Sequence, residues 1–160
     1  MNNVQQQLFG TQSFLAFTLD HRPIVGKPRA VLSNNVRVEL WDNGVLYFHP
    51  QDETLQNSLL LSVGVHGNET APIEIINQLV NDILAGKIMV KQNLLIVIAN
   101  PDAINAECRE VDENMNRLFS EYSTPKSSDS NERHRSRRLM EYSQTFFAAE
   151  AAQKIHYDLH

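Results

Sequence analysis

Two short apolar segments joined by an amphipathic one constrain the fold of this chain most strongly. Residues 59–63 (Leu-Leu-Leu-Ser-Val) and 94–98 (Leu-Leu-Ile-Val-Ile) contain a single polar position between them, as expected of strands covered on both faces. Thr70 is a suitable N-cap for a helix between them, with Pro72 in its first turn and Gly86 just past its end. Apolar residues recur at helical spacing inside it: Ile73, Ile76, Val80, Ile83 and Leu84. Residues 59–99 are therefore predicted to form a βαβ unit with a right-handed crossover.

The segment before this unit is predicted to contribute a β-hairpin. Residues 36–40 alternate apolar and polar side chains, and residues 45–48 form a second strand after the turn sequence Asp-Asn-Gly at 42–44. Residues 1–30 are expected to be irregular, because Pro23, Gly26 and Pro28 interrupt any regular element. Residues 1–50 thus form a lead-in whose ordered part is the hairpin.

The segment after the unit is predicted to add one helix and one strand. Residues 123–131 are rich in serine and indicate a solvated loop, and residues 132–154 are expected to be helical, with Leu139, Tyr142 and Phe146 on one face. Residues 155–160 begin a strand. The fold class is therefore α/β, with a mixed sheet flanked by helices. Because the chain stops inside a strand, we expect residues 1–160 to be the N-terminal part of a domain truncated at its C-terminus.

Composition excludes several classes of function. The net charge of -5 gives no general attraction to nucleic acid or to an anionic membrane. The basic cluster at residues 133–138 lacks interleaved aromatic residues, so we interpret it as the solvated face of a helix. The longest apolar run, residues 94–99, is too short to cross a bilayer. A single cysteine, Cys108, cannot form an internal disulfide, which favours the cytoplasm.

Candidate metal ligands follow directly after the first strand of the βαβ unit. His66 and Glu69 lie where ligands gather in α/β sheets, three residues apart in a loop that Gly64 and Gly67 allow to fold tightly. A catalytic zinc typically takes three protein ligands and one open position, so a third is needed. His160 is the natural candidate. His156 lies about 13 Å further back along the strand, too far to share one ion with it.

Two other groups of polar residues remain open to more than one interpretation. Asp158 lies on the same strand face as His160 and could serve either the outer shell of the metal or a substrate group. Arg109, Asn116 and Arg117 could grip an anionic substrate, since a guanidinium binds a carboxylate bidentately. The alternative is a charged, solvated segment whose arginines pair with neighbouring acids.

Three blocks of the sequence resemble the succinylglutamate desuccinylase and aspartoacylase family. The first is Gly-Val-His-Gly-Asn-Glu at residues 64–69. The second is Asn-Pro at 100–101, followed by Arg109 and by Asn-Arg-Leu-Phe at 116–119. The third is Asp-Leu-His at 158–160. They occur in the family's order and span residues 64–160. The resemblance implies a zinc-carboxypeptidase-like fold.

The resemblance also implies a role for each candidate residue. His66, Glu69 and His160 would bind one zinc ion per chain. Arg109 would polarise the scissile carbonyl and stabilise the oxyanion, whereas Asn116 and Arg117 would hold a substrate carboxylate. Members of the family supply the general base, a glutamate, from beyond the third ligand. We therefore expect the 160-residue chain to bind zinc weakly or not at all and to hydrolyse little.

The substrate implied by the resemblance is a small N-acyl amino acid. The long lead-in, including residues 44–50, resembles the desuccinylases, which hydrolyse N-succinyl-L-glutamate to succinate and L-glutamate in arginine catabolism. Two alternatives stay open. One is an aspartoacylase or a metallocarboxypeptidase on the same scaffold, and the other is a carboxylate-binding module that has lost hydrolysis.

Overall fold

The computed structural model describes residues 3–21, 23–51, 57–119 and 129–160. Within these residues the elements follow in the order α1 (Asn3–Phe9), α2 (Phe14–Leu19), β1 (Arg29–Val31), β2 (Val36–Asp42), β3 (Val45–Pro50), β4 (Ser58–Val63), α3 (Thr70–Leu84), β5 (Asn93–Ile98), α4 (Pro101–Asn105), the 3-10 turn η1 (Met115–Arg117), α5 (Asn131–Ala148) and β6 (Lys154–Leu159). None of the described helices is both long enough and apolar enough to span a bilayer.

The strands form one mixed sheet in the order β1-β2-β3-β5-β4-β6. The hairpin β2–β3 is antiparallel, β3 pairs antiparallel with β5, and β4 runs parallel to both β5 and β6. The predicted α/β class, the hairpin and the βαβ unit β4–α3–β5 are confirmed. This order places the carboxyl ends of β4, β5 and β6 side by side at one edge of the sheet.

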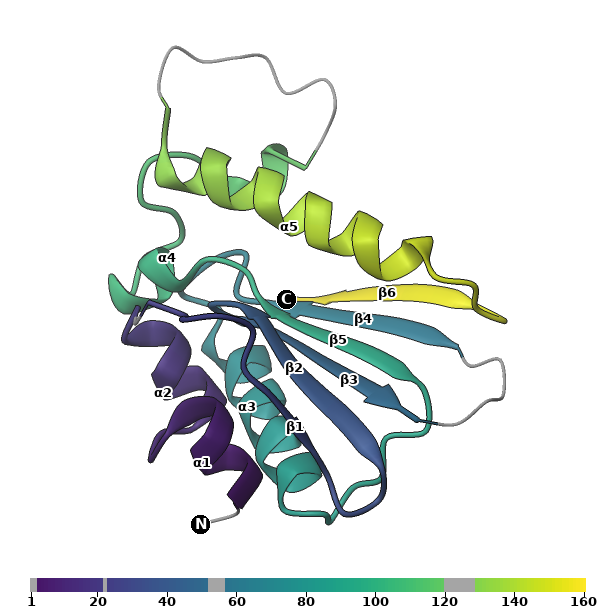
Figure 1. Ribbon diagram of the computed structural model, residues 1–160. Helices are drawn as coiled ribbons and strands as arrows, with labels where there is room; N and C mark the ends of the chain where they lie inside the picture. Colours follow the sequence, from purple (N-terminus) through teal and green to yellow (C-terminus); the bar gives the residue numbers. More distant parts are fainter. Residues whose placement is uncertain (1–2, 22, 52–56, 120–128) are drawn as a thin grey trace.

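Helices cover both faces of the sheet, with α1, α2 and α3 on one side and α5 on the other (Figure 1). The central strand β5 is buried at every position, and it contributes side chains to the hydrophobic clusters on both faces of the sheet. Leu94, Ile96 and Ile98 pack toward the α1–α3 side, whereas Leu95 and Val97 belong to the cluster under α5. This alternation explains the uninterrupted apolar run in the sequence, because both faces of a central strand must be apolar.

The N-terminal lead-in is helical, which corrects the expectation that residues 1–30 are irregular. Helices α1 and α2 occupy residues 3–19 and precede the first of the breaking residues, Pro23. Their apolar side chains are buried in the core on the α3 side, notably Leu8, Phe9 and Phe14. Packing of these apolar side chains stabilises helices too short to form alone.

Two predicted helix ends are also corrected. Helix α3 begins at Thr70, and its N-cap is Glu69, whose side chain makes no capping hydrogen bond. Helix α5 ends at Ala148 rather than at residue 154, because Ala149 adopts an extended backbone conformation. Lys154 instead pairs with Ser58 at the start of β6. Pairing with β4 thus shortens the helix. The predicted loop at residues 123–131 lies mostly outside the described residues.

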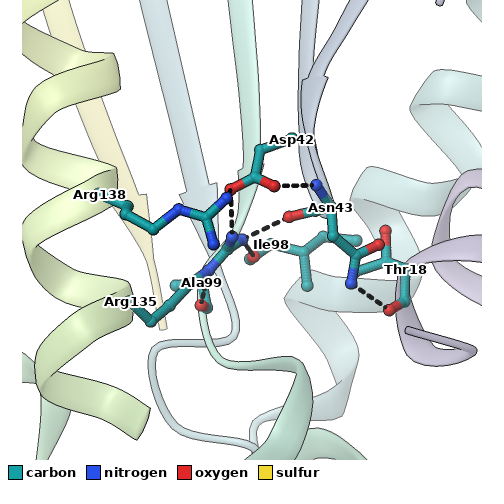
Figure 2. Close-up of polar contacts among 7 residues, drawn as sticks. All are labelled: Thr18, Asp42, Asn43, Ile98, Ala99, Arg135 and Arg138. Carbon is teal, nitrogen blue, oxygen red and sulfur yellow. Dashed lines mark hydrogen bonds and ion pairs between the residues drawn. The ribbon is translucent and has the colours of Figure 1, made fainter. Parts of the chain in front are cut away.

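The basic cluster of α5 is only partly a solvated face: His134, Arg137 and Arg138 are exposed, whereas the side chain of Arg135 points into the protein. The guanidinium of Arg135 donates to the carbonyl oxygens of Asn43 (2.6 Å), Ile98 (3.1 Å) and Ala99 (3.1 Å) and to the carboxylate of Asp42 (3.1 Å) (Figure 2). Arg138 also pairs with Asp42. These contacts tie α5 to the β2–β3 turn and to the carboxyl end of β5.

A second buried arginine fixes the segment that precedes η1. Arg133 forms a two-bond ion pair with Glu113, at 2.6 and 3.2 Å, and both side chains are only 8% exposed. The neighbouring carboxylate of Glu132 accepts hydrogen bonds from the backbone N–H groups of Val111 and Asp112. The first turn of α5 therefore holds residues 111–114 in place beside the sheet edge.

Candidate metal centre

The loop between β4 and α3 is shaped by close contact with α4. A Cβ atom on Gly67 would lie 2.1 Å from the backbone carbonyl carbon of Ala103, so only glycine fits there. Gly64 adopts a left-handed conformation with φ of +66°. The backbone N–H of Gly67 also donates to the carbonyl oxygen of Arg109, at 3.3 Å. These contacts fix the backbone on both sides of His66.

His66, Glu69 and His160 come together at the carboxyl ends of β4 and β6. Each offers one nitrogen or oxygen atom, and these atoms all lie within 4.8 Å of one another. The Nδ1 atom of His66 lies 2.9 Å from Oε1 of Glu69, and Nδ1 of His160 lies 3.3 Å from Oε2. His66 is buried, whereas the side chain of His160 is 44% exposed. The cluster is thus anchored in the core and open on one side.

The carboxylate of Glu69 is electrostatically favoured at the centre of this cluster. Partial burial raises its pKa, but hydrogen bonds and charge interactions with His66 and His160 outweigh burial, and its pKa is lowered overall. Glu69 is therefore ionised at neutral pH and gives the cluster a formal negative charge.

The outer nitrogens of both imidazoles face oxygen atoms. Nε2 of His66 lies 3.3 Å from Oδ1 of Asn114, and Nε2 of His160 lies 2.8 Å from Oδ2 of Asp158. Asn114 Oδ1 also accepts from the backbone N–H of Asn116, at 3.1 Å, which identifies it as an acceptor. With a cation in the centre, these partners accept from Nε2–H of both rings and leave the Nδ1 lone pairs for the ion, whereas without the cation Nδ1 of His66 donates to the Glu69 carboxylate.

This donor set suits a divalent cation such as zinc. Two imidazole lone pairs and a carboxylate converge on one point, and electron-rich atoms in that arrangement are stabilised by a positive ion between them. The hydrogen bonds at both Nε2 atoms are of the kind that orient histidine ligands. Two nitrogens and one oxygen, with an open side at His160, correspond to the ligand number of a catalytic rather than a structural zinc site.

A cavity of about 400 Å³ adjoins this cluster between α5 and the sheet. Most of its lining is apolar, including Leu60, Val97 and Leu139. Its polar lining includes Asn116 and Asp158. A molecule bound in this cavity would therefore lie next to the outer partner of His160.

The structure connects two of the three predicted substrate residues, Arg109 and Asn116, with the cluster or with its cavity. Arg109 is exposed, and its carbonyl oxygen accepts from the backbone N–H of Gly67 in the loop that carries His66. Asn116 is exposed and lines the cavity. Arg117, the next residue of η1, is exposed. Glu113 of the charged segment bonds to Arg133 and Ser130 of the following helix region.

Sequence reasoning did not single out two residues that support the histidines, Asn114 and Ser62. Asn114 stands two positions before Asn116 in the same motif, which is the one signal that could have identified it. Ser62 donates a hydrogen bond of 2.6 Å to Asp158. It is the only polar position in residues 59–63, and a polar residue in a buried strand must find a partner or remain unsatisfied.

The fold and the clustered ligands define a zinc-carboxypeptidase-like α/β protein. The Succinylglutamate desuccinylase/Aspartoacylase catalytic domain matches residues 56–160. The chain therefore belongs to the succinylglutamate desuccinylase and aspartoacylase family, as its three sequence blocks predicted.

Individual relatives agree with this assignment. The chain is 47% identical to the succinylglutamate desuccinylase of Shewanella putrefaciens over 162 residues, covering 97% of this chain and 46% of that protein. The crystal structure of the Vibrio parahaemolyticus succinylglutamate desuccinylase superposes with a TM-score of 0.85 at 34% identity, over 95% of this chain and 44% of that one. The Chromobacterium violaceum desuccinylase gives a TM-score of 0.82 at 34% identity. The chain spans about half the length of the curated relatives it matches.

Proposed function

We propose that this chain binds one Zn²⁺ through His66, Glu69 and His160 and forms part of the catalytic domain of a zinc-dependent amide hydrolase. The observation that carries the proposal is the convergence of three ligand atoms within 4.8 Å, two of them with their rings oriented by hydrogen bonds at Nε2. The open side at His160 leaves the site exposed to solvent, in keeping with weak affinity. The single cysteine favours a cytoplasmic enzyme.

The proposed reaction is hydrolysis of N-succinyl-L-glutamate to succinate and L-glutamate, the reaction of the desuccinylases whose sequences the chain resembles. When bound, zinc would supply Lewis-acid polarisation of the amide carbonyl and activation of a water. Arg109 would donate hydrogen bonds to the carbonyl oxygen as negative charge develops there. Asn116 and Arg117 would hold a substrate carboxylate, for which a guanidinium offers two parallel donors.

The first part of the test measures metal and ligand binding by the chain. Calorimetric titration with zinc sulfate is expected to give one site per chain. With zinc present, N-succinyl-L-glutamate should bind more tightly than N-acetyl-L-aspartate or a peptide with a free carboxyl end, and Arg117→Ala should weaken that binding. Absence of zinc binding by the folded chain would contradict the proposal that residues 1–160 hold the ion on their own. Preference for N-acetyl-L-aspartate would favour an aspartoacylase, and preference for the peptide would favour a metallocarboxypeptidase.

The second part measures turnover against a full-length relative, such as the Vibrio parahaemolyticus desuccinylase. Release of L-glutamate by the 160-residue chain is expected to be far slower than by that relative. Equal rates would show that residues 1–160 contain the general base and would overturn the expectation that it is supplied from beyond the third ligand.

A further inference from the structure

A line of hydrogen bonds extends behind His160 into the sheet. Oδ2 of Asp158 lies 2.8 Å from Nε2 of His160, and Oδ1 of Asp158 accepts from the hydroxyl of Ser62 at 2.6 Å. The same hydroxyl oxygen lies 2.8 Å from Nε2 of His156. Ser62 belongs to β4 and stands directly opposite Asp158 of the parallel strand β6. The pairing of these two strands therefore aligns the four side chains.

The direction of each hydrogen bond follows from the chemistry of the groups. An ionised carboxylate only accepts, so Ser62 gives its one hydroxyl proton to Asp158. The hydroxyl oxygen is then free to accept, and His156 is its donor through Nε2–H. Asp158 accepts in the same way from Nε2–H of His160. The contact of His160 with Asp158 at Nε2, 2.8 Å, is also shorter than its contact with Glu69 at Nδ1, 3.3 Å, so Asp158 is the closer acceptor for the ring proton.

We propose that Ser62 and His156 are positioning residues for the metal centre. They hold the carboxylate of Asp158 in the orientation that keeps the proton of His160 on Nε2 and presents Nδ1 toward Glu69. The inference rests on the proposed function, because it assigns these residues a role in holding zinc. It extends that function to two side chains whose hydrogen bonds reach His160 only through Asp158.

A serine in this strand does not require such a bond merely to be buried. Ser58 lies on the same face of β4, four residues earlier, and is 1% exposed. Its hydroxyl oxygen is buried without a hydrogen-bond partner among the described residues. The strand therefore tolerates an unpaired serine at one position, whereas Ser62 is paired on both sides.

The test compares Ser62→Ala with Ser58→Ala, which removes the same atom from the same strand outside the line of hydrogen bonds. Zinc affinity, measured by competition with a chromophoric chelator, is expected to fall by up to about tenfold in Ser62→Ala, the lower end of the range for outer-shell partners, because Ser62 contacts Asp158 and not a ligand. Ser58→Ala should bind zinc like the wild type. Ser62→Thr keeps the hydroxyl and should recover most of the affinity. The melting temperatures of the metal-free Ser62→Ala and Ser58→Ala chains should be similar.

A second measurement reads the tautomer directly. Two-bond ¹⁵N–¹H NMR of the histidine rings in the metal-free chain should show His160 with its proton on Nε2 in the wild type and in Ser58→Ala, and a mixture of tautomers in Ser62→Ala. Wild-type zinc affinity together with an unchanged His160 tautomer in Ser62→Ala would overturn the inference. A wild-type chain that binds no zinc would contradict the proposed function instead, and the ring NMR would still decide whether Ser62 sets the tautomer.

Discussion

His66 and His160 present the same ring nitrogen, Nδ1, to opposite oxygens of one carboxylate, that of Glu69. Their ring centroids lie 5.9 Å apart although the two residues belong to distant parts of the sequence. The parallel pairing of β4 with β6 brings them together, because His66 follows the end of β4 and His160 follows the end of β6. The geometry of the centre is therefore a property of the sheet.

Substitution of Glu69 by glutamine is expected to remove the metal site. The amide keeps the size of the side chain but loses the negative charge between the two imidazoles, and it places an N–H₂ donor toward Nδ1 lone pairs or a weaker oxygen ligand toward the ion. Zinc affinity should fall by about a hundredfold or more, beyond the effect of losing an outer-shell partner. Calorimetric titration measures it, and Glu74→Gln on the exposed face of α3 is the matched control. Equal affinity of both variants would exclude Glu69 as a ligand.

Substitution of Gly67 by alanine is expected to disturb both the fold and the centre. The added Cβ would lie 2.1 Å from the backbone of Ala103, so either α4 or the loop that carries His66 must move. We expect a loss of about 3 kcal/mol in the free energy of unfolding, at the upper end of overpacking costs, together with weaker zinc binding.

Gly86→Ala provides the comparison for this variant. Gly86 has a φ of +76° and open space around its Cβ position. Alanine there costs only the left-handed backbone strain, roughly 1–2 kcal/mol, and should leave zinc affinity unchanged. Urea denaturation gives both free energies. If Gly67→Ala were the less destabilised variant, the close packing of the loop on α4 would be wrong.

Substitution of Arg135 by methionine is expected to be strongly destabilising. Burial lowers the pKa of Arg135 and Asp42 opposes that effect, and the side chain is only 13% exposed. Methionine would leave three carbonyl oxygens without this donor and Asp42 with Arg138 as its remaining arginine partner. The cost should be about 3 kcal/mol or more, as for other broken buried ion pairs. Arg137→Met, at an exposed neighbouring position, should cost far less in the same urea titration.

The parts of the fold that depend on local patterns could be predicted from the sequence. The uninterrupted apolar run in β5 and the helical spacing in α3 predict the βαβ unit, and the turn at Asn43 predicts the hairpin. Helices α1 and α2 were missed because their stability comes from burying residues such as Phe9 and Phe14 against distant elements. The end of α5 was missed for a similar reason, since pairing with β4 determines where β6 begins.

The residues of the candidate site were predicted or missed for the same reasons as the elements of the fold. His66, Glu69 and His160 were predicted from short blocks and from strand ends, and the structure brings them together. Asn114 and Ser62, which support the histidines, could not be predicted in this way, because their roles depend on contacts between elements. Ser62 faces Asp158 only because β4 and β6 pair in one register, and no local pattern specifies that register. The inward direction of Arg135 was missed because nothing in the composition of α5 shows that acceptors surround it.

Stability is expected to fall as the pH falls through the titration range of His156. Burial lowers the pKa of this imidazole from its ordinary value of 6.5, and the nearby carboxylate of Asp158 opposes the effect only in part. The unfolded chain therefore takes up a proton at a higher pH than the folded chain does. The free energy of unfolding should be at its full value above about pH 6.5, decrease below it, and level off once the folded protein is also protonated.

The variant His156→Asn isolates this contribution. Asparagine keeps a side-chain N–H₂ donor for Ser62 but does not titrate, so the variant should show a smaller decrease in stability between about pH 7.5 and pH 5. Urea denaturation at intervals of half a pH unit on the metal-free chain gives both curves. Their difference should grow as the pH falls, with the variant gaining on the wild type. Parallel curves would show that His156 has the same pKa in the folded and unfolded chains, and that burial of its ring does not affect its titration.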